Sequence, residues 1–179
     1  MRKWMPELQM SETDEAVRTA LDSLGKDDLD GSWSGRRERE VVSLFAFGPL
    51  LDQVSQEGFL QDSGQVGIEI AIPQVAVGDE DLHGKKSQVC KDLVIWPEPQ
   101  MTCWNKKDDP EHAPAAVVEW KFGLNRVSQR DVDWLKAFTD EYPNCTGYAV
   151  TANQSGAEFT LSCTRVADGQ EEPEWVYIS

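Results

Sequence analysis

Residues 115–122 read Ala-Ala-Val-Val-Glu-Trp-Lys-Phe, an apolar run interrupted by two charged side chains. A run of this length that ends at Gly123 predicts a β-strand. Because side chains alternate across a strand, Glu119 and Lys121 lie on one face, and the other face carries Val118, Trp120 and Phe122. Charged groups within an apolar strand are costly to bury unless they are paired or bind something. The stretch therefore places a carboxylate and an ammonium side by side, in need of a partner.

Asp92 begins an earlier apolar segment, residues 92–96, which Pro97 ends and which predicts the preceding strand. We expect its carboxylate to reach the same sheet edge as Glu119. Carboxylates that converge repel one another unless a cation lies between them, and hard oxygen ligands favour Mg²⁺ or Mn²⁺. Such an ion polarises a phosphate and activates water, which a neighbouring lysine such as Lys121 orients. The three residues together indicate phosphodiester hydrolysis.

The acid-x-Lys pattern is weak by itself, although no other lysine of the chain has an acid two residues before it. Its position in a strand, after a strand that begins with Asp92, gives it weight. The competing interpretation is a salt bridge across strands at a sheet edge.

The chain length suits one α/β domain, residues 1–179, with a mixed sheet flanked by helices. Helical periodicity and capping residues predict helices at 11–24, 34–51 and 128–142, with a kink near Gly48-Pro49. The expected strands are 68–77, 92–96, 115–122, 146–152, and a terminal antiparallel pair at 158–166 and 175–178. We expect a core at about 34–152, an N-terminal helical extension at 1–33, and C-terminal strands within 158–178.

A helix, three strands, a helix and a strand, with Asp92 before Glu119-Trp120-Lys121, resemble the PD-(D/E)XK nuclease superfamily. The resemblance covers about residues 34–152 and implies a restriction-endonuclease-like core of order α-β-β-β-α-β. It also implies that Asp92, Glu119 and the carbonyl of Trp120 bind Mg²⁺ or Mn²⁺, and that Lys121 assists the attacking water. Lys91 stands where the family name has proline, a position that varies within the family.

The resemblance also implies a carboxylate from the first core helix. Glu40 is the expected residue, because Leu44, Phe47 and Leu51 follow at i+4, i+7 and i+11 and place it on the inward stripe. Glu38 is the alternative. Both acids also suit the first turn of a helix for electrostatic reasons alone.

The net charge is −15, from 32 acidic and 17 basic residues, so the molecule as a whole repels a polyanion. A nucleic-acid site must then be local, or a protein partner must deliver the substrate. Candidate substrate contacts are Arg37, Lys86 and Lys91, from the basic clusters 36–39 and 85–91, together with Gln74. An ordinary solvated face balancing the acids explains the clusters equally well. Trp96, Trp104 and Trp120 suit base stacking or, more commonly, a core.

The N-terminus shows no secretory signal and no apolar run long enough for a bilayer, which predicts a cytoplasmic protein without a membrane partner. The four scattered cysteines form no metal motif and are expected to be free thiols.

Two functions from different classes follow. The first is a metal-dependent nuclease, acting on DNA by family habit. The second is an inactive protein of the same fold that serves as an acidic interaction or regulatory module. The sequence leaves the type of nucleic acid, its strandedness, the cleavage pattern and the oligomeric state open.

Overall fold

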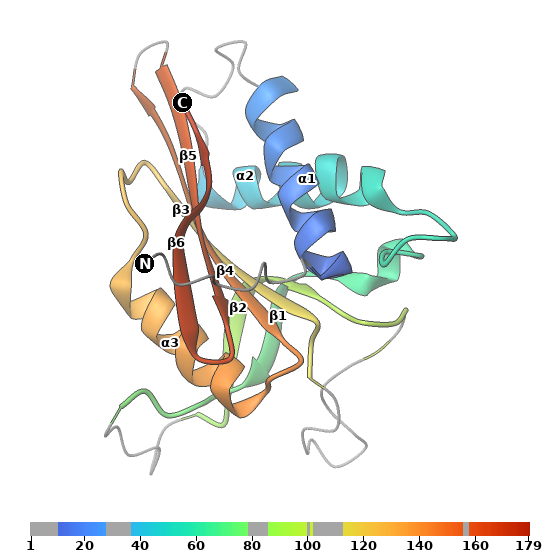
Figure 1. The fold of residues 1–179 in the computed structure, drawn as a ribbon, viewed down its shortest axis with the longest axis vertical. Helices are drawn as coiled ribbons and strands as arrows, with labels where there is room; N and C mark the ends of the chain where they lie inside the picture. Colours follow the sequence, from blue (N-terminus) through green and yellow to red (C-terminus); the bar gives the residue numbers. More distant parts are fainter. Residues whose placement is uncertain (1–10, 28–36, 79–85, 100, 102–112, 156–157) are drawn as a thin grey trace, which may run out of the picture.

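In the computed structural model, the chain folds into a six-stranded mixed sheet with helices on both faces (Figure 1). The structure describes residues 11–27, 37–78, 86–99, 101, 113–155 and 158–179. The strands are β1 (Val66–Pro73), β2 (Gln88–Ile95), β3 (Ala116–Phe122), β4 (Thr146–Ser155), β5 (Glu158–Ala167) and β6 (Gln170–Ile178). The helices are α1 (Glu12–Asp27), α2 (Glu38–Phe45) and α3 (Gln129–Glu141). Short turns η1 (Ala46–Leu50), η2 (Leu51–Gln53) and η3 (Ser63–Gln65) complete the order.

The strands lie in chain order, β1-β2-β3-β4-β5-β6. All neighbours are antiparallel except β3 and β4, which are parallel because α3 crosses between them. The predicted α/β class with a mixed sheet is confirmed. The sheet is wider than the four strands of the expected core, because β5 and β6 extend it beyond β4.

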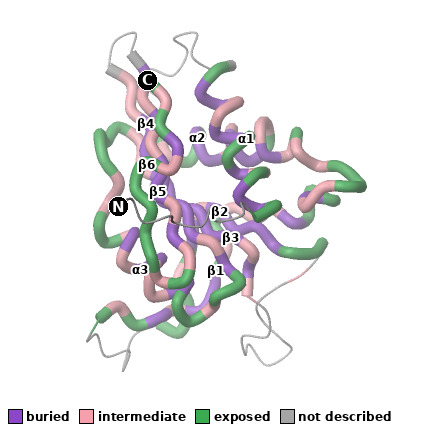
Figure 2. Tube along the Cα trace, in the orientation of Figure 1, coloured by how far each residue is buried: buried purple, intermediate pink, exposed green. Residues whose placement is uncertain are grey.

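Two hydrophobic clusters sandwich the sheet, and buried positions are concentrated along its central strands (Figure 2). Helices α1 and α2 pack on one face, and α3 packs on the other (Figure 1). In β3 the alternation is as predicted: Val118 and Trp120 join the α1/α2 cluster, whereas Val117 joins the α3 cluster. Glu119 and Lys121 therefore share the α3 face.

Several predicted boundaries were wrong. Strand β1 ends at Pro73 rather than residue 77, and β2 begins at Gln88, so Asp92 lies inside its strand rather than at its start. Helix α2 is α-helical only to Phe45 and then widens into a π-helical turn that contains Pro49. Proline lacks an N–H and clashes with the preceding turn, which explains the irregularity. Residues 34–36 of the expected helix lie outside the described part.

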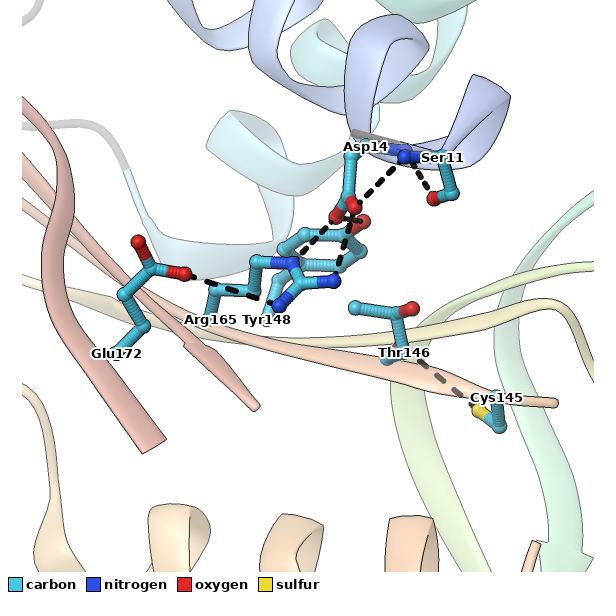
Figure 3. A network of polar contacts seen from close by, with 7 residues as sticks. All are labelled: Ser11, Asp14, Cys145, Thr146, Tyr148, Arg165 and Glu172. Carbon is cyan, nitrogen blue, oxygen red and sulfur yellow. Dashed lines mark hydrogen bonds and ion pairs between the residues drawn. The ribbon is translucent and has the colours of Figure 1, made fainter. Parts of the chain in front are cut away.

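Helix α1 is more than an appendage, because a buried polar network joins it to the sheet (Figure 3). The Asp14 carboxylate accepts hydrogen bonds from Tyr148 Oη at 2.7 Å, and from Arg165 Nε at 2.6 Å and Nη2 at 2.9 Å. Ser11 and Asp14 also cap the start of the helix reciprocally. Burial raises the pKa of Asp14, but the bonds from Arg165 and Tyr148 outweigh it and lower that pKa.

Of the cysteines, Cys90, Cys145 and Cys163 lie in the described part, and all three are free, as expected; Cys103 lies outside it. Burial raises the pKa of the Cys145 and Cys163 thiols well above the usual value. No helix in the described ranges has the length and apolar character needed to cross a bilayer.

Replacing Asp14 tests whether α1 belongs to the folded core. Asp14→Ala leaves the buried Tyr148 hydroxyl unpaired and removes the main partner of the partly buried Arg165 guanidinium, which keeps only a 3.7 Å contact with Glu172. We therefore expect the free energy of unfolding to fall by about 3 kcal/mol. Urea denaturation measures it. Glu15→Ala, an exposed acid of the same turn, serves as the control and should change little. Equal effects of the two substitutions would contradict this account of the network.

Candidate functional site

Strands β2 and β3 part where the charged residues begin. Their ladder covers Leu93 to Ile95 against Ala116 to Val118 and stops there. Strand β3 continues in register with β4 as far as Phe122. Past the last pair, the Asp92 carboxylate takes the place of a ladder partner and accepts a hydrogen bond from Trp120 N at 2.8 Å. The opening leaves room for side chains between the strands.

Glu119 enters this opening and meets Asp92, as the sequence predicted. The neighbouring Asp92 carboxyl group contributes to the raised pKa of Glu119. Burial is the largest cause of the shift, the ion pair with Lys91 opposes it, and the result is a pKa of about 7. Only 8% of Glu119 is exposed.

Lys91 is the unexpected member of the site. Its ammonium pairs with Glu119 and lies 3.4 Å from the ring centre of Trp134 on α3. The residue is 5% exposed, and burial lowers the pKa of its ammonium despite the attraction of Glu119. We expected Lys91 to contact substrate directly, and this was wrong: it is an interior side chain, not one on a binding surface.

Gln74 is likewise turned toward the protein. Its Oε1 accepts a hydrogen bond from Trp134 Nε1 at 2.9 Å, so it positions the ring that faces Lys91. This engagement replaces the substrate contact predicted for it. Trp134 itself escaped the sequence analysis, because an apolar helix position gives no signal of a neighbouring buried cation.

Lys121 lies on the same face as Glu119, at the end of β3. Its Nζ donates to the carbonyl oxygen of Trp120 at 2.6 Å and lies 3.6 Å from Glu38 and 3.8 Å from Asp131. Burial lowers the pKa of this ammonium, but the surrounding carboxylates outweigh it and raise the pKa above its usual value. The lysine is therefore held in its charged form.

The helix carboxylate that lies near Lys121 and Asp92 is Glu38, the alternative to the expected Glu40. Glu40 is exposed, and its Oε2 accepts a hydrogen bond from Arg37 N at 3.0 Å, which caps α2. The buried stripe of the helix runs through Val41, Val42 and Phe45. These positions follow Glu38 at i+3, i+4 and i+7, whereas Phe47 on the expected stripe is 67% exposed.

A local irregularity turns Asp92 toward α2. In β1, Val66 and Ile68 pack in the α1/α2 cluster but Ile70 and Ile72 pack in the α3 cluster. Strict alternation would keep these residues on one face. The change occurs at Glu69, whose φ of 54° is in the left-handed region. Strand β2 changes face at the same level, since Val89 packs with α3 and Leu93 with α2.

Asp92 consequently lines a surface depression of about 350 Å³ beside α2. The other lining residues are Glu38, Arg39, Val42, Ser43, Ile68 and Glu69. Arg39 Nε is 2.7 Å from Glu69 Oε1, and the Arg39 side chain is 83% exposed. The depression gives solvent a route to the Asp92 carboxylate.

The remaining predicted contacts lie apart from this depression or outside the described residues. Arg37 and Lys86 are exposed and do not line it. Trp96 and Trp120 are buried, and Trp120 packs against Phe45 with ring centres 5.3 Å apart, so both belong to the core. Trp104 lies outside the described residues.

The donors available to a metal ion are the two carboxylates and the Trp120 carbonyl. No three His, Cys, Asp or Glu side chains gather in metal-binding positions within the described ranges. Hard oxygens nevertheless suit Mg²⁺ or Mn²⁺, and Asp92 and Glu119 meet. In this structure Lys91 pairs with Glu119, and Lys121 holds the Trp120 carbonyl. A metal ion at this position would have to displace both ammonium groups.

Comparison with known proteins gives no relative: no family model, no curated protein and no solved structure matches the chain.

The raised pKa of Glu119 predicts a pH dependence of stability. Because the pKa is about 7 in the folded chain and 4.5 without the fold, the folded chain holds an extra proton between these values. Stability from this group is therefore present below pH 4.5 and is lost as the pH rises through 7. Relative to the double variant Lys91→Met/Glu119→Gln, wild type should lose on the order of 3 kcal/mol over this window.

Urea denaturation of both proteins at a series of pH values measures this difference. The double variant cancels the contribution of every other group, since only the buried pair is removed. Two stability curves that stay parallel from pH 4 to pH 8 would show that Glu119 titrates normally.

Proposed function

We propose that this protein is a divalent-metal-dependent nuclease that hydrolyses phosphodiester bonds in nucleic acid, with DNA as the first substrate to test. The observation that carries the proposal is the convergence of Asp92 and Glu119 in the opening between β2 and β3. Lys121 lies on the face of Glu119, and Asp92 and Glu119 both contribute to its raised pKa.

The arrangement of elements supports the resemblance to the PD-(D/E)XK nucleases. Helix α2 precedes three antiparallel strands, and α3 leads from β3 into the parallel strand β4. This order is compatible with a restriction-endonuclease-like core of α-β-β-β-α-β. On this proposal β5, β6 and α1 are additions to that core.

In the proposed reaction Asp92, Glu119 and the Trp120 carbonyl hold Mg²⁺ or Mn²⁺. When bound, the ion polarises the scissile phosphate and lowers the pKa of a water molecule. Lys121 orients the attacking water and offsets the charge that develops on the phosphate. Glu38 and Asp131 keep the Lys121 ammonium charged and in place.

A protein of net charge −15 needs a local cation to attract a phosphate. Among the described residues that line the depression at Asp92, Arg39 is the only cation. Glu69 contacts its Nε, and the exposed guanidinium presents further donors that suit phosphate oxygens. We therefore assign the phosphate contact to Arg39 in place of Gln74 and Lys91.

Metal binding and cleavage test the proposal together. We expect wild type to bind Mn²⁺ and to cleave at least one substrate in a panel of single- and double-stranded DNA and RNA. Asp92→Asn keeps an acceptor for Trp120 N but removes a charged ligand, so Mn²⁺ affinity should fall by about tenfold or more. Lys121→Met should retain Mn²⁺ binding and lose most cleavage.

Asp52→Asn, an exposed acid outside the site, is the matched control and should change neither quantity. A folded wild-type protein that ignores Mn²⁺ and leaves every nucleic acid intact would contradict the nuclease proposal.

The second candidate is an inactive protein on the same fold, which uses its acidic surface to bind a basic partner. One observation favours it: Lys91 and Lys121 satisfy the oxygens that a metal ion would need. On this view the charged cluster is a structural ion-pair network. The Mn²⁺ titration separates the two candidates, because a structural network gives no specific response to Asp92→Asn.

The assignment of Arg39 has its own test, in which two substitutions that break the same ion pair act in opposite directions. Arg39→Ala removes the phosphate contact and should raise KM about tenfold with a smaller effect on kcat. Glu69→Gln frees Arg39 and removes a negative charge, so KM should stay the same or fall. If both substitutions raise KM equally, Arg39 and Glu69 merely stabilise the rim.

A further inference from the structure

The Lys91 ammonium is a full charge held in the interior, and its surroundings explain how it is tolerated. It has one charged partner in Glu119 and one aromatic partner in Trp134. Removing an ammonium from water is costly unless both electrostatic and hydrogen-bonding needs are met. The ring face and the carboxylate together meet these needs.

The ring of Trp134 is fixed on both sides. Gln74 accepts the hydrogen bond from its indole nitrogen, and Phe138 stacks on the ring with centres 4.8 Å apart and planes 20° apart. Trp134 is 6% exposed, so it is packed tightly. Lys91 therefore lies against a rigid aromatic surface, which attracts a cation even without a carboxylate.

The Lys91 ammonium pairs with Glu119, the carboxylate that the proposed metal ion also requires as a ligand. Lys91 pairs with Glu119 Oε1, and the Asp92 carboxyl group lies near enough to Glu119 to affect its pKa. A divalent cation placed between the two acids would repel the ammonium, because like charges at contact distance are strongly unfavourable in a buried site. The two cations compete for one group.

We propose that Lys91 is a resident counter-ion of the site: it neutralises Glu119 until a divalent cation replaces it, and the face of Trp134 then retains the displaced ammonium. This inference rests on the proposed function. It makes metal binding an exchange of cations in which no buried carboxylate is left without a positive partner. Trp134 and Gln74 are positioning residues, since they act through Lys91.

The competing interpretation is a structural ion pair that the metal never disturbs. Lys91→Met separates the two, because methionine keeps the length and apolar contacts of the side chain but removes the competing charge. We expect the variant to bind Mn²⁺ about tenfold more tightly than wild type, measured by electron paramagnetic resonance of free Mn²⁺. Lys91→Arg retains the charge and should not show the gain.

Substitutions of Trp134 give an opposite and graded response. Trp134→Leu removes the aromatic face, so an ammonium displaced from Glu119 keeps no partner and Mn²⁺ affinity should fall severalfold. Trp134→Phe retains a ring and should lie between the leucine variant and wild type. Unfolding measurements on each variant establish that it is folded.

The outcomes distinguish this inference from the proposed function. If wild type binds Mn²⁺ and the folded Lys91→Met variant binds it equally or more weakly, the counter-ion role is wrong and the metal site stands. If neither protein binds Mn²⁺, both are wrong.

Should Lys91→Met not fold, nuclear magnetic resonance of the wild-type lysine side chains gives the answer. The Lys91 signals should shift as Mg²⁺ is added, because the ammonium leaves Glu119. Unchanged Lys91 signals in a protein that binds Mg²⁺ would overturn the proposal.

Discussion

The site depends on the point at which β2 and β3 cease to pair. Beyond Leu93 and Val118 the Asp92 carboxylate, rather than a backbone carbonyl, accepts the hydrogen bond from Trp120 N. This side-chain acceptor pairs the N–H of Trp120, which would otherwise be left unpaired at the core. It also opens the sheet on one side of β3 while β4 holds the other side in register. Glu119 and Lys91 fill the space that results.

Burial then governs the electrostatics. Glu119 and Lys91 are both shifted toward their neutral forms, because desolvation outweighs their mutual attraction. A buried ion pair in this condition contributes little to the stability of the fold. Lys121 differs, since its surrounding acids favour the charged form. The site thus combines an interior pair, whose charged forms burial disfavours, with a lysine at its edge whose charged form the surrounding acids favour.

Sequence reasoning predicted the parts of this site that follow from strand periodicity. The alternation of β3 placed Glu119 and Lys121 on one face, and the order of the elements brought Asp92 to Glu119. It favoured Glu40 over Glu38, because the inward stripe was chosen from Leu44, Phe47 and Leu51. The helix changes from α-helical to π-helical geometry at residue 46, so these side chains do not mark one face of α2. It missed the interior position of Lys91, because the alternation of side chains in β2 breaks between residues 89 and 93. The face on which Lys91 lies therefore could not be deduced by counting residues along the strand. No pattern in the sequence indicates the positive φ of Glu69, at which β1 changes face.

The most direct test of this account is a crystal structure of the protein soaked in Mn²⁺, with the anomalous signal recorded. The expected result is an anomalous peak in contact with the carboxylates of Asp92 and Glu119, and a Lys91 ammonium that has separated from Glu119 but remains on the Trp134 ring. A map without a peak between the two acids, in which Lys91 still pairs with Glu119 at saturating Mn²⁺, would contradict it.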